Sequence, residues 1–212
     1  MSGSPRPRIP PRARKSPKDE ASGPGPSGRV RIIGGAYRRT PLAVVDVPGL
    51  RPTPDRVRVT LFNWLEHLLG GCTGKRALDL FAGTGALGLE MASRGAREVV
   101  LVESNARAAQ ALRGMQQKLE ASSVRVLQAD WHVAAAALAP ASFDVVFLDP
   151  PFDSGLLERA IAVGRRIVAP EGLLYVEAGQ AVGAADWERW QLDLVRADRA
   201  GAVHFHLLRI RA

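Results

Sequence analysis

The sequence predicts an α/β fold built on a mainly parallel sheet. From Lys75 onwards, short apolar runs alternate with segments of helical periodicity, the pattern of parallel strands joined by right-handed helical crossovers. Two further runs near the C-terminus, 191–196 and 203–211, are separated by only six residues. Because that connection is too short for a parallel crossover, we expect these runs to pair as an antiparallel hairpin at the sheet edge. The expected sheet therefore has five parallel strands plus a C-terminal hairpin.

A small extension is predicted before this sheet. Residues 30–33 and 42–45 are expected to form two short strands of a hairpin around a Gly-Gly pair. A helix should follow, with Thr53 as its N-cap and Pro54 at its first position, and the glycines at 70 and 71 should end it.

The remaining elements follow from apolar runs bounded by glycine, proline or acidic residues. The predicted strands are 76–81, 98–102, 124–128, 143–148 and 172–177. The predicted helices are 85–94, 105–120, 131–138, 154–168 and 184–190.

Composition separates the first 28 residues from the rest. They hold seven of the fifteen prolines, six Lys or Arg and two acids, with few large apolar side chains. Such a segment cannot bury enough surface to offset its ordering entropy, so residues 1–28 are expected to be a disordered basic tail. The tail carries half of the net charge of +8 (six basic minus two acidic residues). A basic tail on a basic domain favours a polyanionic partner.

The cysteine and histidine content limits which disulfides and metal sites the chain can form. Cys72 is the only cysteine, which excludes an internal disulfide and suits a reducing cytoplasm. No spacing of His and Cys is typical of a zinc site, so no metal is expected. No run of the sequence is long and apolar enough to cross a membrane.

A glycine-rich loop after the first strand predicts a nucleoside pocket. Gly83, Gly85 and Gly88 have the G-x-G-x-x-G spacing, which lets a ligand approach the backbone at a helix N-terminus. Glu103 ends the next strand about twenty residues on, where an acid accepts both ribose hydroxyls. Asp130 follows the third strand and could accept from an adenine amine. Nicotinamide-dependent enzymes share this loop, so the loop alone does not identify the ligand.

A second corner lies at the end of the fourth strand, where residues 149–152 are Asp-Pro-Pro-Phe. The prolines stop the strand at the edge where open α/β sheets place their sites. A planar base with an exocyclic amine fits this corner, because its ring can stack on Phe152 while its amine donates to Asp149 and a backbone carbonyl. Beside the nucleoside pocket, and with Asp79 ending the first strand, the corner predicts methylation of an amino group on a base.

One segment of the chain is especially distinctive, Arg-Pro-Thr-Pro-Asp-Arg-Val-Arg at 51–58. Together with segments 31–35, 61–65, 79–90, 149–152 and 203–207, it resembles the RsmD family of bacterial 16S rRNA guanine-N2 methyltransferases. The resemblance spans roughly residues 29–209. Two positions differ from the family pattern: Pro54 replaces a threonine, and Val59 replaces a glutamate.

The resemblance implies a class I, Rossmann-like fold with S-adenosylmethionine as methyl donor. Residues 29–72 are then the hairpin and helix extension, and residues 73–212 the methyltransferase domain. The candidate catalytic residues are Asp149, Pro150, Pro151 and Phe152. The candidate donor-binding residues are Asp79, Phe81, Gly83, Thr84, Gly85, Gly88, Glu103, Asp130, Thr53 and Arg56.

A basic cluster near the predicted hairpin is expected to bind RNA. Arg38, Arg39 and Arg51 can hold the RNA backbone, and Tyr37 can stack on a base. The family implies 16S rRNA, within a small-subunit particle, as the partner. We expect no DNA partner, no membrane partner and a cytoplasmic monomer.

Three alternatives remain open from the sequence. An adenine-N6 nucleic-acid methyltransferase would share the pocket, but an aspartate can accept both N1–H and N2–H of guanine, whereas adenine has an acceptor at N1. A nicotinamide-dependent dehydrogenase would share the glycine loop and leave the Asp-Pro-Pro-Phe corner unexplained. A non-catalytic RNA-binding or ribosome-assembly module could retain the pocket without using it.

Overall fold

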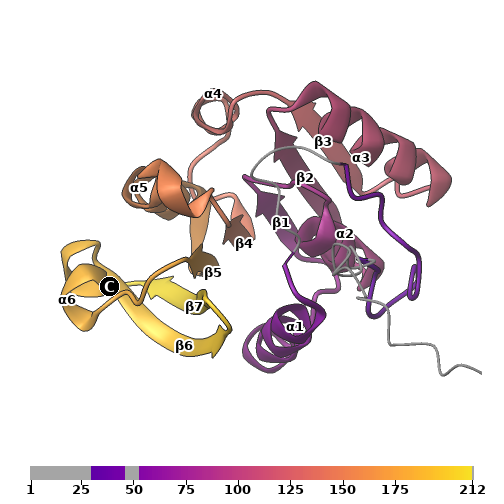
Figure 1. Cartoon of the computed structure of the whole chain (residues 1–212). Coiled ribbons are helices and arrows are strands. Elements are labelled where there is room, and N and C mark those ends of the chain that lie inside the picture. The colour runs from indigo at the N-terminus through magenta and orange to yellow at the C-terminus, as the bar shows by residue number, and fades with distance from the viewer. Residues whose placement is uncertain (1–29, 46–52, 212) are drawn as a thin grey trace, which may run out of the picture.

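The computed structural model describes residues 30–45 and 53–211 (Figure 1). The tail predicted for residues 1–28 and the candidate RNA-binding residue Arg51 lie outside the described residues. Every helix within the described ranges is too short or too polar to cross a membrane.

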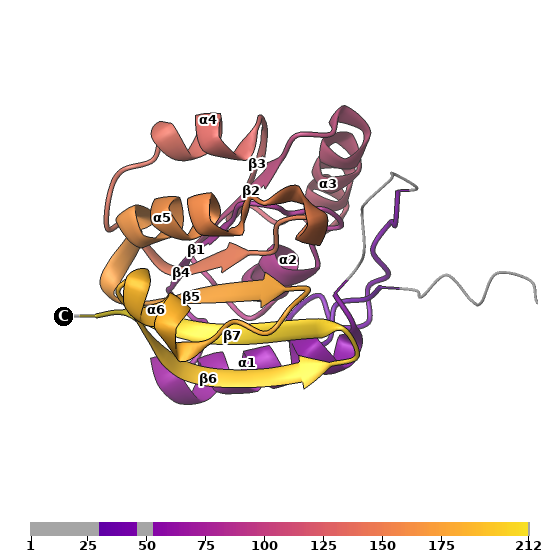
Figure 2. The same cartoon turned by 60° about the vertical axis from the view of Figure 1, so that its left-hand side comes forward.

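One seven-stranded sheet organises the chain, in the order β3-β2-β1-β4-β5-β7-β6. Its strands are β1 (Arg76–Asp79), β2 (Glu98–Glu103), β3 (Val124–Gln128), β4 (Phe143–Leu148), β5 (Val168–Ala178), β6 (Leu192–Ala200) and β7 (Val203–Ile210). Strands β1 to β5 pair in parallel, and β7 lies antiparallel between β5 and β6. Figure 2 shows the β6–β7 hairpin at one edge of the sheet, which confirms the predicted architecture.

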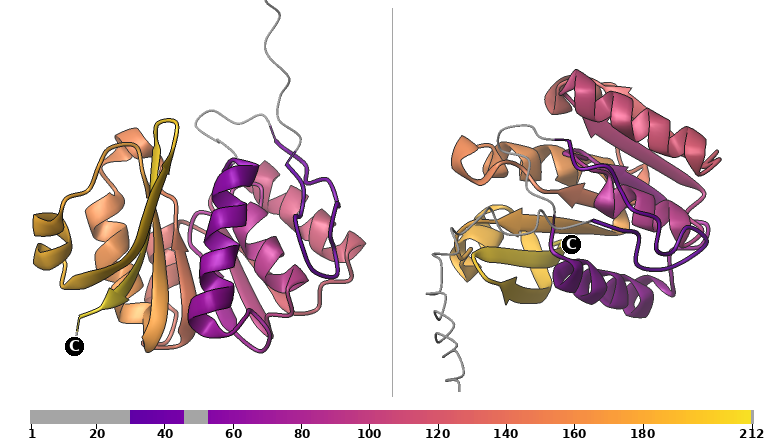
Figure 3. Two further views of the ribbon diagram at one scale, coloured as in Figure 1. Left: turned by 90° about the horizontal axis from the view of Figure 1, so that it is seen from below. Right: turned by 45° about the vertical axis from the view of Figure 1, so that its right-hand side comes forward.

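Helices cover both faces of this sheet (Figure 3). One face packs against α1 (Asp55–Leu69), α2 (Ala86–Ser93) and α3 (Ala106–Lys118). The other packs against α4 (Trp131–Ala136), α5 (Leu157–Ile167) and α6 (Ala184–Arg189). Trp64 of α1 stacks on Phe205 of β7 with ring centroids 5.3 Å apart. On the opposite face Trp187 of α6 lies 4.9 Å from the ring of His206, so these residues join helices to the sheet.

The N-terminal hairpin is less regular than predicted. Its only bridge among the described residues joins Arg31 to Pro41. The amides of Ile33 and Gly34 donate instead to the buried Glu90 carboxylate of α2, at 2.6 and 2.8 Å. Because these donors are already used, no regular strand forms there, and the segment is held against α2.

The start of α1 also differs from the prediction. Pro54 occupies the N-cap with extended backbone angles (φ −57°, ψ 146°), and no side chain caps the helix. Thr53 is therefore not the N-cap. It stands one residue outside the helix, where its buried hydroxyl is free for tertiary contacts.

Other boundaries shift by a few residues. Strand β5 begins at Val168 rather than 172 and is continuous through Pro170. A short 3₁₀ turn, η1 (Phe152–Ser154), precedes α5, which starts at Leu157. The topology brings the C-terminal ends of β1 to β5, the N-termini of α1 and α2 and the β6–β7 turn to one edge of the molecule, called the carboxyl edge below.

Gly88 shows how closely α2 packs on the sheet. A Cβ added there would lie 2.1 Å from Leu101 Cδ2 and 3.2 Å from Val99 Cγ1. Gly114, on the exposed side of α3, would place a Cβ in open space.

These two glycines give a matched test of packing. Gly88→Ala should destabilise the protein by about 1–3 kcal/mol, because the methyl group overfills the helix–sheet contact. Gly114→Ala should stabilise it by about 0.5–1 kcal/mol, because alanine favours the helix. Urea unfolding of both variants measures the two effects, and equal stabilities would contradict the packing described here.

Candidate active site

Acidic side chains gather where neighbouring strands end at the carboxyl edge. Asp79 is the last residue of β1, and Asp149 directly follows β4. Glu177 is the second-last residue of β5. The register pairs Leu148 with Val176, so its continuation places Asp149 beside Glu177. Asp79 and Glu177 are each only 2% exposed, and Asp149 is partly buried.

Burial changes the ionisation of these three acids, called the acid row below. Desolvation raises the pKa of Asp79 to about 7, and the nearby Glu103 and Glu177 add to the shift. Desolvation likewise raises the pKa of Glu177 to about 7. The pKa of Asp149 lies well above its usual value because of desolvation and the charges of Glu177 and Asp79.

Two hydroxyl groups contact the acid row. The Tyr175 hydroxyl donates to Glu177 Oε1 at 2.8 Å. The buried Thr53 side chain lies beside both Asp149 and Glu177 and lowers the pKa of each carboxyl. No ion pair among the described residues involves Asp79, Asp149 or Glu177. The row is therefore a cluster of buried carboxyl groups whose ionised forms a neighbouring cation would stabilise.

The glycine loop lies next to this row. Gly83 and Gly85 both have positive φ angles, 52° and 77°. The Gly83 amide donates to Glu103 Oε2 at 2.9 Å, and the Asn105 amide donates to Glu103 Oε1 at 2.7 Å. Glu103 is thereby held at the loop, as its predicted role with a ribose requires. A small hollow here is lined by Gly83, Thr84, Ala43, Ala108, Ala111, Leu112 and Met115.

An aromatic wall stands at the ends of β1 and β3. Phe81 lies 5.6 Å from the ring of Trp131, which begins α4. Asp130, predicted to contact an adenine, is the N-cap of α4 and accepts from the backbone amide and ring of His132. Its carboxylate is about half exposed, so Asp130 borders the wall rather than joining the acid row.

The Asp-Pro-Pro-Phe corner lies at the rim of the acid row. Pro150 is buried and Pro151 is exposed. Phe152 is 37% exposed, and its ring packs over Gly179, where an added Cβ would lie 2.9 Å from Phe152 Cδ2. A glycine just after β5 therefore makes room for the ring, and the corner combines an accessible aromatic side chain with a neighbouring carboxylate.

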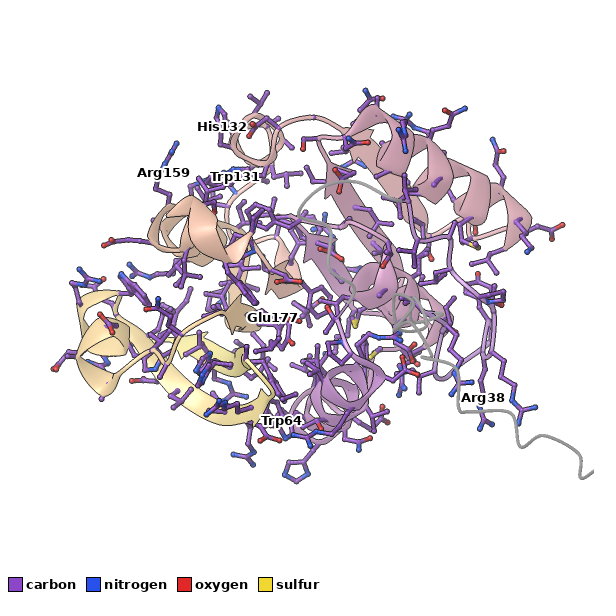
Figure 4. The ribbon with its side chains drawn as sticks, viewed as in Figure 1. Arg38, Trp64, Trp131, His132, Arg159 and Glu177 are labelled. Carbon is purple, nitrogen blue, oxygen red and sulfur yellow. The ribbon has the colours of Figure 1, made fainter. Side chains whose placement is uncertain are left out.

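The predicted RNA-binding residues that the structure describes lie away from the acid row and the glycine loop. The Ala36 and Tyr37 amides donate to the Ser93 carbonyl and hydroxyl at the C-terminal end of α2. Arg38 and Arg39 are exposed on this turn, while Tyr37 is partly buried against the core. Because the glycine loop is at the other end of α2, these arginines are about one helix length, roughly 12 Å, from the pocket. Figure 4 shows Arg38 at the periphery, far from Glu177.

Arg56 is placed at the carboxyl edge but not within the acid row. Its guanidinium is exposed and donates to the Arg199 carbonyl in β6 at 2.6 Å. The neighbouring Arg58 is fully buried and donates to Asp55 and to the Arg31 carbonyl, so it is structural. Val59 is 42% exposed, so the position at which the family pattern has a glutamate lies at the surface of this chain.

Sequence reasoning missed two residues of this site. Glu177 ends a buried strand in an acid, the same signal that identified Asp79 and Glu103. Trp131 directly follows Asp130 and could have been noticed as an aromatic at a strand end.

The described residues contain no group of three or more His, Cys, Asp or Glu side chains placed to hold a metal ion. Cys72 is buried, and burial raises the pKa of its thiol to about 11.

Comparison with known proteins identifies the family of this chain. The family model described as conserved hypothetical protein 95 matches residues 30–209. The Escherichia coli (strain K12) protein named ribosomal RNA small subunit methyltransferase D is 41% identical over 187 residues, covering 85% of this chain and 90% of that protein. The chain belongs to the RsmD family.

Further relatives of this RsmD family member support the assignment. The Haemophilus influenzae protein of the same name is 37% identical over 189 residues, covering 87% of this chain and 95% of the relative. Among solved structures, the methyltransferase yhhF from Escherichia coli has a TM-score of 0.72 at 36% identity and covers 87% of this chain and 99% of its own. The fold is that of a class I methyltransferase, and the chain is a methyltransferase by family.

Proposed function

We propose that this RsmD family member transfers a methyl group from S-adenosylmethionine to the exocyclic N2 of a guanine in 16S rRNA of the small ribosomal subunit. The observation that carries the proposal is the acid row beside the glycine loop, with Asp149 at its rim. That arrangement suits a cationic donor and an amine acceptor meeting at one edge of the sheet. The relatives named ribosomal RNA small subunit methyltransferase D support rRNA as the substrate.

The carboxyl edge fits the proposed donor. The acid row presents buried carboxylates without a basic partner among the described residues, which complements the positive charge of a sulfonium. Glu103 would accept from the ribose hydroxyls, and Phe81 and Asp130 would contact the adenine. Asp79, Gly83, Thr84, Gly85 and Gly88 would form the loop around the donor, and Thr53 and Arg56 its border at α1.

The Asp-Pro-Pro-Phe corner fits a guanine. Asp149 accepts hydrogens from N1 and N2, and the Pro150 carbonyl accepts the second hydrogen of N2. Phe152 can stack on the ring because its side chain is accessible. Pro151 stiffens the turn that holds both acceptors. The target base must leave its stack to enter, which a loop of rRNA permits at low cost.

The residues act mainly by orienting the amine. The N2 lone pair is delocalised into the guanine ring, and acceptors at Asp149 and Pro150 favour a nitrogen whose lone pair points at the methyl group. S-adenosylmethionine, when bound, would supply an electrophilic methyl group to N2 and would leave as the neutral thioether. The nitrogen becomes acidic as the N2–C bond forms, and Asp149 takes one N2 proton and later releases it to water.

Label transfer tests the proposal directly. Methyl-labelled S-adenosylmethionine is incubated with the protein and either small-subunit particles, free 16S rRNA or DNA, with particles and rRNA taken from cells lacking this gene. We expect labelled N2-methylguanosine in particles or rRNA, and nucleoside analysis identifies it. Labelled N6-methyladenine would overturn the choice of base, and donor binding without transfer to any substrate would favour a non-catalytic RNA-binding module.

Arg38 and Arg39 are exposed on the turn beside the C-terminal end of α2, and we propose that they bind the RNA backbone at a distance from the pocket. Replacing Arg38 and Arg39 together by Glu should weaken rRNA binding at least about tenfold at low salt, because phosphate contacts are lost and repulsion is added. Donor affinity should stay unchanged, because the turn is distant from the glycine loop. Filter binding and calorimetry measure the two affinities. Unchanged RNA affinity would show that the rRNA contact lies elsewhere.

A further inference from the structure

The turn between β6 and β7 lies close to the Asp-Pro-Pro-Phe corner. At the corner the Phe152 ring packs over Gly179, the residue directly after β5. In the sheet register Ala178 pairs with His204 of β7, and His204 pairs with Arg199 of β6. Neighbouring strands lie about 4.8 Å apart, so two strand spacings, about 10 Å, separate the backbones of Ala178 and Arg199. Arg199 is therefore close to the place where the target base is proposed to bind.

The Arg199 side chain lies on the face of the sheet that α5 and α6 cover. Directly paired residues point to the same face, so Arg199 shares a face with His204 and Ala178. Two residues further along β7, a side chain of this face contacts α6. Phe152 begins the 3₁₀ turn that leads into α5, a helix of the same face. Arg199 therefore flanks the corner on the α5 side.

Two guanidinium groups at this turn carry charges that no carboxylate among the described residues pairs with. Arg56 of α1 donates to the Arg199 carbonyl at 2.6 Å, and Arg199 Nε donates to the Gly201 carbonyl at 2.7 Å. Both arginines are exposed, and neither belongs to an ion pair within the described ranges. A guanidinium has five N–H donors, so each group keeps donors for an acceptor from outside the chain.

The neighbouring acids do not cancel these charges. Asp55 pairs with the buried Arg58 at 2.6 Å. Asp198 accepts from the Arg199 backbone amide at 2.7 Å. Its pairing with Phe205 places Asp198 on the α1 face of β6, opposite to the Arg199 side chain. The turn therefore presents a net positive charge to an approaching ligand.

We propose that Arg199 and Arg56 bind the phosphate next to the target guanine and thereby hold the RNA strand whose base enters the corner. The inference rests on the proposed function, to which it adds a contact with the RNA backbone. A base that leaves its stack is positioned by contacts to the flanking nucleotides. Arginine suits this role because its planar fork of donors matches the oxygens of a phosphate. The site is separate from Arg38 and Arg39, which lie beside the C-terminal end of α2.

The position of the two guanidinium groups favours RNA over an acidic protein as the partner. A base bound at the corner brings its own phosphates into the same region, about two strand spacings or 10 Å away. An acidic protein bound at the turn would occupy the space that these phosphates need.

The salt dependence of RNA binding tests the phosphate contact. Affinity for free 16S rRNA, taken from cells lacking this gene, is measured by filter binding across a series of salt concentrations. Arg199→Gln should weaken binding about twofold to fivefold at low salt, as the loss of one exposed ion pair does. The plot of log affinity against log salt should lose about 0.7 of its slope, the contribution of one phosphate in a single strand. An unchanged slope would overturn the proposal.

Two further variants separate the contact from folding and from net charge. Arg199→Lys keeps the charge and should keep the salt slope of the wild type. Arg196→Gln removes another exposed arginine of β6, which pairs with Leu207 and so lies on the α1 face, and its slope should also stay at the wild-type value. Equal losses in Arg196→Gln and Arg199→Gln would show a general effect of net charge and contradict the contact. A loss of affinity for small-subunit particles with none for free rRNA would identify a protein partner and contradict it as well.

Cross-linking tests whether the turn lies next to the target guanine. Cys72 is the only cysteine of the chain and is buried, so a cysteine introduced at the exposed Ala202 in the turn accepts a photoreactive maleimide selectively. Ala202→Cys should cross-link to nucleotides adjacent to the guanine that the wild type methylates, as mapped by primer extension. Ser122→Cys, exposed just before β3 and away from the carboxyl edge, is the control and should not cross-link there. Cross-links of Ala202→Cys confined to distant nucleotides would contradict the proposal.

The outcomes distinguish this site from the proposed function. If the wild type binds rRNA and transfers no methyl group, the proposed function fails, while the salt slope of Arg199→Gln still decides whether the turn contacts phosphate. If the wild type methylates guanine, and Arg199→Gln binds and methylates rRNA as well as the wild type does, only the contact at the turn is refuted.

Discussion

The burial of carboxylates at the ends of adjacent parallel strands is the constraint on which the rest of this structure depends. The register of β1, β4 and β5 brings Asp79, Asp149 and Glu177 to one edge, where desolvation and mutual repulsion disfavour their charges. The folded chain accommodates them with a hydrogen bond from the Tyr175 hydroxyl to Glu177, and the pKa values of all three acids are raised. A cation would relieve the same repulsion, so an arrangement that costs folding stability would supply affinity for the proposed sulfonium donor.

The N-terminal extension completes this edge. Thr53 reaches the acids because α1 begins two residues later and packs on the sheet through Val57, Leu61 and Phe62. The preceding segment is fixed by Glu90, whose buried carboxylate accepts from two backbone amides and from Arg94. The extension and the sheet therefore share one hydrophobic core. The proposed roles of Thr53 at the donor site and of Arg38 and Arg39 with RNA therefore depend on how this short segment docks.

The sequence allowed the strands, the crossovers and the glycine loop to be predicted because each has a local pattern. The glycine loop illustrates this: its spacing predicted a turn between a strand and a helix, which the structure has between β1 and α2, whereas the close packing of Gly88 on Leu101 was not predicted. Thr53 was wrongly predicted as an N-cap, because the capping rule is local while its actual environment is the tertiary contact with Asp149 and Glu177. Glu177 carried the same local signal as Asp79 and Glu103, an acid at the end of a buried strand, but its place beside Asp149 follows only from the pairing of β4 with β5. The distance of Arg38 from the pocket depends on bonds to Ser93, more than fifty residues away in the chain.

The most direct test of the account is the nucleoside composition of 16S rRNA in cells that lack this gene. The RNA is digested and N2-methylguanosine is counted by mass spectrometry after complementation with the wild-type chain or with Asp149→Asn. The account predicts that N2-methylguanosine falls in the deletion strain, returns with the wild type and does not return with Asp149→Asn. An unchanged content in the deletion strain, or full recovery with Asp149→Asn, would contradict it.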